Sequence, residues 1–277
     1  MSKVLIRYQV YFGLLLLLSA CSGPMETYDT LIRNASLIDG LGNPARTADI
    51  YIKDGLIAKV TGSGEINADS TATIDARGRV VTPGFIDIHS HGDPLVTPGF
   101  ENFLAQGVTT ITLGQDGSSP NVEDLGGWLA TVRANGIGVN LAMFVGHGTL
   151  RNLAGIGRKA NPSEDELQRM VGLLDGALDY TFGLSTGLEY NPGLHASQAE
   201  LITLSQTVGA RHRVIMSHMR NEDDDQLEQS IAELLHQGRH ARVHIAHLKS
   251  VYGKGRARAE ELLAVLARAR AAGVAIT

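Results

Sequence analysis

The chain has 277 residues, of which 43% are hydrophobic and 19% charged, a composition typical of a globular protein with one large domain or two smaller ones. Its formal net charge of −5 argues against nucleic acid as a partner. The single cysteine, Cys21, excludes an intramolecular disulfide.

Residues 1–21 are predicted to be a signal peptide. Lys3 and Arg7 provide a positive start, and residues 10–18 form an apolar stretch too short for an ordinary transmembrane helix. Small residues then lead to Cys21, an arrangement that resembles the lipobox of bacterial lipoproteins, where the peptide is cut before the cysteine and the cysteine carries lipid. We therefore expect a lipid anchor on Cys21 in the bacterial envelope, at the periplasmic face. Ser22 at the next position resembles sorting to the outer membrane; the alternative is a plain secretory signal with an incidental cysteine.

Residues 22–82 are predicted to form short strands and turns. The stretches 30–38, 49–53 and 56–60 have strand-like apolar patterns, and Asp54-Gly55 between the last two is a strong signal for a two-residue hairpin turn. This pattern indicates part of a small β-sandwich before the main domain.

From residue 83 to residue 277, strands and helices alternate. Ser163 and Glu166 predict a capping box at the start of a helix, and Ser197 with Glu200 predicts a second helix that opens in the same way. Two further helices are expected over 222–237 and 256–272. The strand candidates are residues 85–89, 109–113, 140–145, 182–185, 214–217, 243–246 and 274–277. Repeated strand–helix units predict an α/β fold, and polar residues just after the strands favour a (β/α)₈ TIM-type barrel.

The barrel is expected to be incomplete. The stretch from residue 83 to residue 277 is shorter than the roughly 250 residues of a typical (β/α)₈ barrel. We therefore expect the last strand and the closing elements to be missing from this sequence.

Four histidines at three predicted strand ends indicate a metal centre. His89 and His91 are two residues apart, so on a strand both side chains would point to the same face, and His218 and His247 each end a later strand. In a barrel these ends converge on one mouth, where Zn²⁺ accepts such ligands, keeps a position open for water and turns that water into a nucleophile. Asp116, which ends the second strand, is a candidate to bridge a second ion; equally, it could be a turn-forming aspartate before glycine.

Several segments resemble a known family. Residues 85–91, Phe-Ile-Asp-Ile-His-Ser-His, resemble the first strand of the amidohydrolase superfamily. Residues 145–151, Val-Gly-His-Gly-Thr-Leu-Arg, and 182–190, Phe-Gly-Leu-Ser-Thr-Gly-Leu-Glu-Tyr, resemble one branch of it, the N-acyl-D-amino-acid deacylases, or D-aminoacylases. Residues 217–220 and 247–249 are similar to the same branch, and the similarity runs from about Tyr28 to the last residue.

The resemblance implies roles for the metal-binding residues. His218 and His247 would hold one tightly bound zinc, and His89 and His91 would line a second, weaker site. The family often has a cysteine where this chain has Asp116. A carboxylate also binds Zn²⁺, so bridging stays plausible, while the number and affinity of the metals are left open.

The resemblance also implies substrate contacts. Lys249 matches a lysine that contacts the substrate carboxylate, and Tyr190 lies in the segment that shapes the substrate pocket. Arg220 is a second candidate for the same anion, or else forms an ion pair with Glu222 or Asp223. The catalytic aspartate of the family, which takes and returns a proton, is expected beyond Thr277, so no catalytic residue is assigned within the chain.

The expected function is zinc-dependent hydrolysis of the amide bond of N-acyl-D-amino acids to a carboxylate and a free D-amino acid. One alternative is a dihydroorotase-like or isoaspartyl-dipeptidase-like amidohydrolase; against it, the fourth strand lacks the bridging lysine of those enzymes. The other is a truncated, inactive lipoprotein. His147, His195, His244 and Asp87 are not expected to replace the catalytic aspartate, and His244 is expected to face a helix layer.

Overall fold

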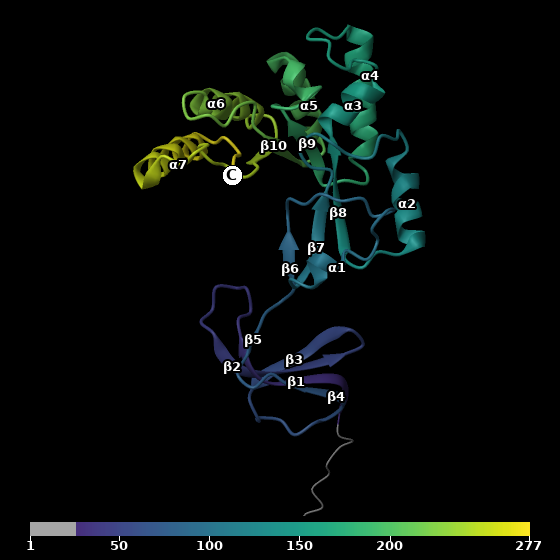
Figure 1. Cartoon of the computed structure of the whole chain (residues 1–277), viewed down its shortest axis with the longest axis vertical. Coiled ribbons are helices and arrows are strands. Elements are labelled where there is room, and N and C mark those ends of the chain that lie inside the picture. Colours follow the sequence, from purple (N-terminus) through teal and green to yellow (C-terminus); the bar gives the residue numbers. More distant parts are fainter. Residues whose placement is uncertain (1–25) are drawn as a thin grey trace, which may run out of the picture. The chain divides into compact units, whose positions relative to one another are not determined.

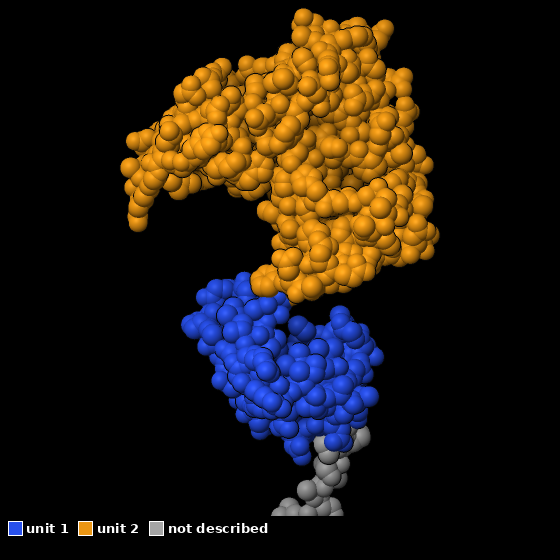
Figure 2. All heavy atoms as spheres, in the orientation of Figure 1, with its two compact units in different colours: residues 1–83 blue, residues 84–277 orange. Residues whose placement is uncertain are grey.

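The computed structural model describes residues 26–277, so the predicted signal peptide and Cys21 lie outside the described residues. The chain divides into two compact units between Pro83 and Gly84 (Figure 2). Each unit has its own sheet and its own buried clusters. Between residues 26 and 277, no helix combines the length and the apolar character that crossing a membrane requires.

The first unit is a five-stranded sheet in the order β3-β2-β1-β4, with β5 beside β1. Asp54 and Gly55 join β2 to β3 with φ values of 53° and 74°, the positive values that a type I′ hairpin needs, so the predicted hairpin is confirmed. Alternate residues of β1 and β2, among them Ala35, Ala48 and Ile50, form a small buried cluster. The strands are β1 (Thr27–Leu37), β2 (Arg46–Lys53), β3 (Leu56–Gly62), β4 (Asp69–Asp75) and β5 (Val80–Val81).

The second unit contains a six-stranded sheet whose neighbouring strands are all parallel, in the sequential order β6 to β11. The strands are β6 (Phe85–Asp87), β7 (Val108–Leu113), β8 (Asn140–Gly146), β9 (Gly183–Gly187), β10 (Val214–His218) and β11 (Arg242–Ile245). Strands of one direction in sequential order, connected through helices, are the (β/α)₈ pattern. The expected incomplete barrel is confirmed, and a separate sheet precedes it. Where part of a small β-sandwich was expected, the described residues of the first unit form a single five-stranded sheet.

Helices cover one side of this curved sheet (Figure 1). They are α1 (Glu101–Leu104), α2 (Leu125–Asn135), α3 (His147–Leu153), α4 (Glu164–Ala177), α5 (Gln198–Ala210), α6 (Leu227–Gln237) and α7 (Gly255–Ala271), with a 3-10 turn at Gly193–His195. The capping box predicted at the start of α4 is present: Ser163 Oγ accepts from the Glu166 N–H, and the Glu166 carboxylate accepts from the Ser163 N–H.

The two faces of the sheet have different cores. Ile215, Val243 and Ile245 pack with buried helix residues such as Leu204 and Leu234, whereas a separate cluster of Phe144, Met216 and Ala246 lies on the opposite face. His244 alternates with Val243 and Ile245 and pairs in register with Met216. The expectation that His244 faces a helix layer is therefore wrong, because strand alternation turns it to the barrel interior.

Three predicted elements differ from the structure. Helix α6 begins at Leu227 instead of residue 222. The acidic side chains before it bind residues elsewhere in the fold; Asp224, for example, accepts hydrogen bonds from Ser250 and Arg258. Residues 274–277 lie parallel to β11, with Ile276 opposite Val243 and backbone hydrogen bonds from Val243 and Ile245 to Ala275 and Thr277, so the predicted pairing is present but is shorter than a full strand. At the start of α5 the Ser197 hydroxyl accepts from the Glu200 N–H, but the Glu200 side chain turns inward, so half of the predicted box is missing.

Candidate metal centre

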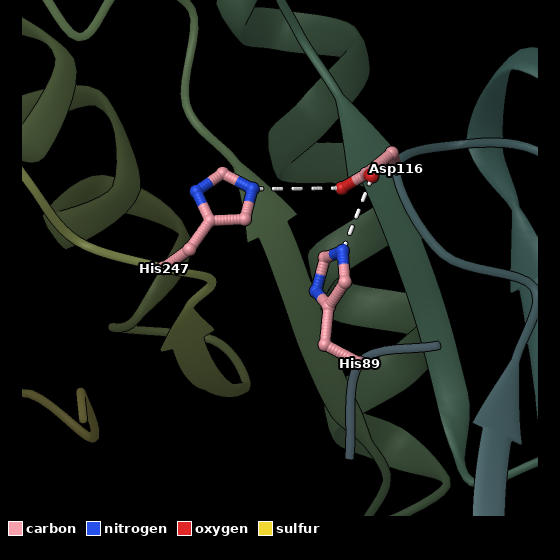
Figure 3. A group of neighbouring side chains, drawn as sticks. All are labelled: His89, Asp116 and His247. Atoms are coloured by element: carbon pink, nitrogen blue, oxygen red, sulfur yellow. Dashed lines mark hydrogen bonds and ion pairs between the residues drawn. The ribbon is translucent and has the colours of Figure 1, made fainter. Parts of the chain in front are cut away.

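The carboxyl ends of β6, β7, β10 and β11 bring the predicted ligands to one place. His89 and His91 follow β6, Asp116 follows β7, His218 ends β10, and His247 follows β11. Figure 3 shows His89 and His247 turned towards Asp116 from separate segments. The imidazole centroids of His89 and His247 are 5.1 Å apart, and those of His218 and His247 are 4.6 Å apart. The structure therefore gathers all five predicted ligands.

Asp116 lies between two pairs of histidines. Its Oδ2 is 3.2 Å from Nε2 of His89 and 3.1 Å from Nε2 of His91. Its Oδ1 is 3.7 Å from Nδ1 of His218 and 3.9 Å from Nε2 of His247. Each carboxylate oxygen thus faces one pair of histidines, as a bridging carboxylate would, while Asp116 also lies in a turn before Gly117 with a left-handed φ of 53°.

The backbone around Asp116 is shaped by close approach. Gly114 has a φ of 80°, and a Cβ there would lie 2.0 Å from the carbonyl oxygen of Phe144. Asp116 itself has a left-handed φ of 53°. The Gln115 amide donates to the Ile88 carbonyl at 3.2 Å and so ties this turn to the loop that carries His89. Only glycine at position 114 allows the turn that aims Asp116 at the histidines.

The far nitrogens of two histidines face carboxylates that the sequence analysis did not include in the site. Nε2 of His218 is 2.8 Å from Oε2 of Glu189, and Nδ1 of His247 is 2.9 Å from Oε1 of Glu222. Their near nitrogens, Nδ1 of His218 and Nε2 of His247, are 3.0 Å apart. Glu189 lies in residues 182–190, the segment that resembles the deacylases, but strand spacing alone gives no signal that either glutamate contacts a histidine.

Burial favours neutral histidines here. Burial, followed by the nearby Lys249 ammonium, holds the pKa of His247 below its usual value despite the opposing effect of Glu222. Burial also lowers the pKa of the interior His244, with a smaller contribution from His89. Neutral imidazole is the form that binds metal.

The structure places the three predicted substrate residues differently. The Tyr190 hydroxyl is 3.4 Å from Nδ1 of His218, and burial, followed by the charges of Asp116 and two glutamates, raises the pKa of the phenol. Lys249 Nζ donates to Glu222 and lies 3.2 Å from Nδ1 of His247. Both side chains border the centre.

Arg220 lies apart from the Asp116 cluster. Its guanidinium pairs with Glu233 at 2.8 Å and donates to the carbonyls of Leu194 and Ala196. The partner proposed from sequence, Glu222 or Asp223, is wrong, because the turn before α6 sends Glu222 to Lys249 instead. A substrate contact by Arg220 stays a prediction.

Two cavities flank His91. One of about 460 Å³ is lined by Asp116, Gly148, Tyr190 and Asn191 among others. The other, of about 380 Å³, extends on the side of Asp93, Ser119 and Trp128. Both are large enough for a small-molecule substrate, and polar side chains predominate among those that border them.

The donor set fits a divalent cation. Two imidazole nitrogens lie 3.0 Å apart, and the far nitrogen of each ring has a carboxylate oxygen within 2.9 Å. With the ring protons on the far nitrogens the two lone pairs would face each other, an arrangement that a cation between them stabilises. Asp116 Oδ1 is buried and makes no hydrogen bond among the described residues, so it too has an unused lone pair aimed at this point. Nitrogen and oxygen ligands of this kind suit Zn²⁺.

The comparisons agree with this geometry. No protein-family model matches the chain. It is 35% identical to an N-acyl-D-glutamate deacylase of Alcaligenes xylosoxydans xylosoxydans over 90% of this chain and 56% of that protein. The crystal structure of N-acyl-D-glutamate deacylase from Bordetella bronchiseptica, complexed with zinc and a phosphonate inhibitor, is 33% identical, with a TM-score of 0.83 over 91% of this chain and 58% of that one. A D-aminoacylase with a binuclear metal centre is 29% identical, with a TM-score of 0.82 over 90% of this chain and 57% of that one. The chain thus spans somewhat over half the length of these relatives.

Proposed function

Because the chain is a relative of the N-acyl-D-amino-acid deacylases of the amidohydrolase superfamily, we propose that the protein hydrolyses the amide bond of N-acyl-D-amino acids. The products would be a carboxylate and a free D-amino acid. The observation that carries this proposal is Asp116, which lies with one oxygen towards His89 and His91 and the other towards His218 and His247.

The proposed cofactor is Zn²⁺. His218 and His247 would hold the tightly bound ion, His89 and His91 would line a weaker site, and Asp116 would contribute to both. Bound Zn²⁺ supplies Lewis acidity, which lowers the pKa of a coordinated water towards neutrality and polarises an amide carbonyl.

Two side chains of the chain would bind the substrate. Tyr190 keeps its phenol proton, because burial and the neighbouring carboxylates raise its pKa, and it can donate a hydrogen bond to a substrate oxygen beside His218. The half-exposed Lys249 ammonium can pair with the substrate carboxylate, while Glu222 holds it from the buried side. These contacts would orient the scissile amide over Asp116.

A substrate panel tests this function. The purified protein with added Zn²⁺ is assayed against N-acetyl-D-glutamate, N-acetyl-D-methionine, both L-enantiomers and dihydroorotate. We expect release of the free D-amino acids. Turnover of the L-forms or of dihydroorotate alone would overturn the assignment, and zinc binding without any turnover would favour an inactive, metal-binding chain.

We also propose that the protein is a lipoprotein anchored through Cys21, at the periplasmic face of the outer membrane. The support is the sequence alone: the charged start, the short apolar stretch and the small residues before Cys21. The wild-type protein should incorporate radioactive palmitate and sediment with outer membranes, and Cys21→Ala should abolish labelling. Unchanged labelling of Cys21→Ala would reject the anchor.

A further inference from the structure

Each of the two closely paired histidines has a carboxylate behind it. Glu189 reaches the far nitrogen of His218 at 2.8 Å, and Glu222 reaches the far nitrogen of His247 at 2.9 Å. The near nitrogens of the two rings then face each other at 3.0 Å. The arrangement is symmetrical in chemistry, although the four residues come from three stretches of the chain: Glu189, the segment from His218 to Glu222, and His247.

The carboxylates decide which ring nitrogen carries the proton. An ionised carboxylate only accepts hydrogen bonds, so a histidine that faces one is favoured with its proton on that side. For His218, which is hydrogen-bonded to Glu189, this places the lone pair on Nδ1. For His247 the lone pair would lie on Nε2 once Nδ1 donates to Glu222, and both lone pairs would then point at the space beside Asp116, where ligands of a cation are needed.

Lys249 offers a competing arrangement for His247. Its Nζ lies 3.2 Å from Nδ1 of His247, which it could reach only as a donor, and that would move the ring proton to Nε2. The Glu222 contact is shorter, although of the two only the Lys249 contact has hydrogen-bond geometry. Lys249 also donates to the other oxygen of Glu222. The ammonium is thereby held by Glu222. Oε1 of Glu222 makes no hydrogen bond among the described residues, so it is left to accept from Nδ1 of His247 once the ring turns into line with it.

Glu222 is fixed in place by its surroundings. Its side chain is only 7% exposed, and its carbonyl accepts from the Val251 N–H at 3.1 Å. The neighbouring Asp224 is held by Ser250 and Arg258, which ties the loop before α6 to α7. A buried carboxylate held this firmly can restrain the ring it faces, whereas Glu189, about half exposed, can do so less strongly.

We propose that Glu222 and Glu189 are positioning residues that fix the tautomer and orientation of His247 and His218, and so set the affinity of the centre for a divalent cation. Glu222 in addition holds Lys249 at the edge of the substrate site. This inference rests on the proposed function, because it assumes that the centre binds Zn²⁺.

The test measures Zn²⁺ affinity of the purified full chain by competition with a chromophoric chelator. We expect Glu222→Gln to weaken Zn²⁺ binding by about 10- to 100-fold and Glu189→Gln by roughly tenfold, the range seen when partners behind metal ligands are lost. Glu260→Gln, which removes an exposed ion pair with Arg256, is the matched control and should leave the affinity unchanged. Lys249→Met should not weaken binding, since the ammonium repels the cation.

Co²⁺ bound in place of Zn²⁺ gives a second readout through its visible absorption. The Co²⁺ bands should shift in Glu222→Gln and Glu189→Gln and stay unchanged in Glu260→Gln, which a general loss of stability would not produce. If circular dichroism shows that Glu222→Gln does not fold, Zn²⁺ affinity and the Co²⁺ spectrum of the more exposed Glu189→Gln variant test the positioning role.

The outcomes separate this inference from the proposed function. Wild-type affinity and spectra in both glutamate variants would overturn the positioning role and leave the hydrolase proposal intact. Markedly tighter binding in Lys249→Met, with Glu222→Gln unchanged, would show that Lys249 and not Glu222 sets the tautomer of His247, and would overturn the role of Glu222. A wild-type chain that binds no Zn²⁺ would overturn the inference together with the metal centre.

Discussion

Asp116 lies within 4 Å of both pairs of histidines. Asp116→Ala removes the oxygens 3.1–3.9 Å from the four imidazoles, so we expect Zn²⁺ affinity to fall by more than about tenfold. Asp116→Cys supplies a thiolate, another ligand that Zn²⁺ accepts, and should retain most of the affinity. Isothermal titration with Zn²⁺ checks both variants; equal affinity in Asp116→Ala would show that Asp116 is not a ligand.

A second buried group of charges lies away from the metal centre. Glu200, 1% exposed, accepts from Arg151 at 2.7 Å and contacts Nε2 of His147 at 2.7 Å. Burial alone would raise the pKa of Glu200, but His147 and Arg151 hold it below its usual value. This network fixes α5 against α3 and accounts for the inward turn of Glu200.

Glu200→Gln should destabilise the chain by about 3–5 kcal/mol at pH 7, because Arg151 is then buried without its counter-ion. A carboxylate with a lowered folded pKa stabilises above its unfolded value, near pH 4.3, and loses that contribution as pH falls through the folded value. The difference between wild type and variant in urea unfolding should therefore shrink below about pH 4. The exposed Glu123→Gln should show no such change; a pH-independent difference for Glu200→Gln would contradict the ion-pair explanation.

At this scale the histidines could be predicted and their partners could not. His89, His91, His218 and His247 each follow an apolar strand-like run, which is a local signal. Glu189, Glu222 and Glu200 contact histidines 29, 25 and 53 residues away along the chain, and no local pattern encodes such pairs.

Among the elements, the turn after β7 carries Asp116 to the histidines through the close approach of Gly114 to β8. Gly114→Ala would bring a Cβ to 2.0 Å from the Phe144 carbonyl at a φ of 80°, so we expect a loss of at least about 2 kcal/mol of stability and weaker Zn²⁺ binding.

The matched control is Gly172→Ala, in the exposed middle of α4, where a Cβ meets no atom within 4 Å. That substitution should stabilise the chain by up to about 1 kcal/mol, since alanine favours helix over glycine. Thermal unfolding of the two variants checks the contrast. Equal effects would show that the approach of Gly114 to β8 does not constrain the turn.

Element boundaries follow local signals only where those signals are complete. The capping box starts α4 as predicted, because both of its side chains stay at the helix end. The start of α6, and the loss of the Glu200 half of the predicted capping box at α5, depend on contacts that acidic side chains make with distant residues. Helix propensity, which is a local property, does not predict such contacts. Helix α2 escaped prediction because Gly126 and Gly127 weaken its first turn.

For the whole molecule, Zn²⁺ binding should stabilise one unit selectively. All five candidate ligands lie in the unit of residues 84–277, so free Zn²⁺ at 100 times its dissociation constant should raise the unfolding free energy of that unit by about 2.7 kcal/mol. Amide hydrogen exchange should slow around β7, β10 and β11 and stay unchanged in β1 to β4. Chelation by EDTA should reverse the effect, and equal protection of both units would contradict it.

The alternation of strands and helices, the hairpin at Asp54-Gly55 and the four candidate histidines can be predicted from the amino-acid sequence, because each depends on residues close together in the chain. The position of Asp116 between two histidine pairs, the interior position of His244, and the contacts of Glu222 with His247 and Lys249 instead of Arg220 follow from the three-dimensional fold. Parallel strands bring distant segments to one edge of a sheet, and which side chains meet there depends on register and on backbone turns such as that at Gly114.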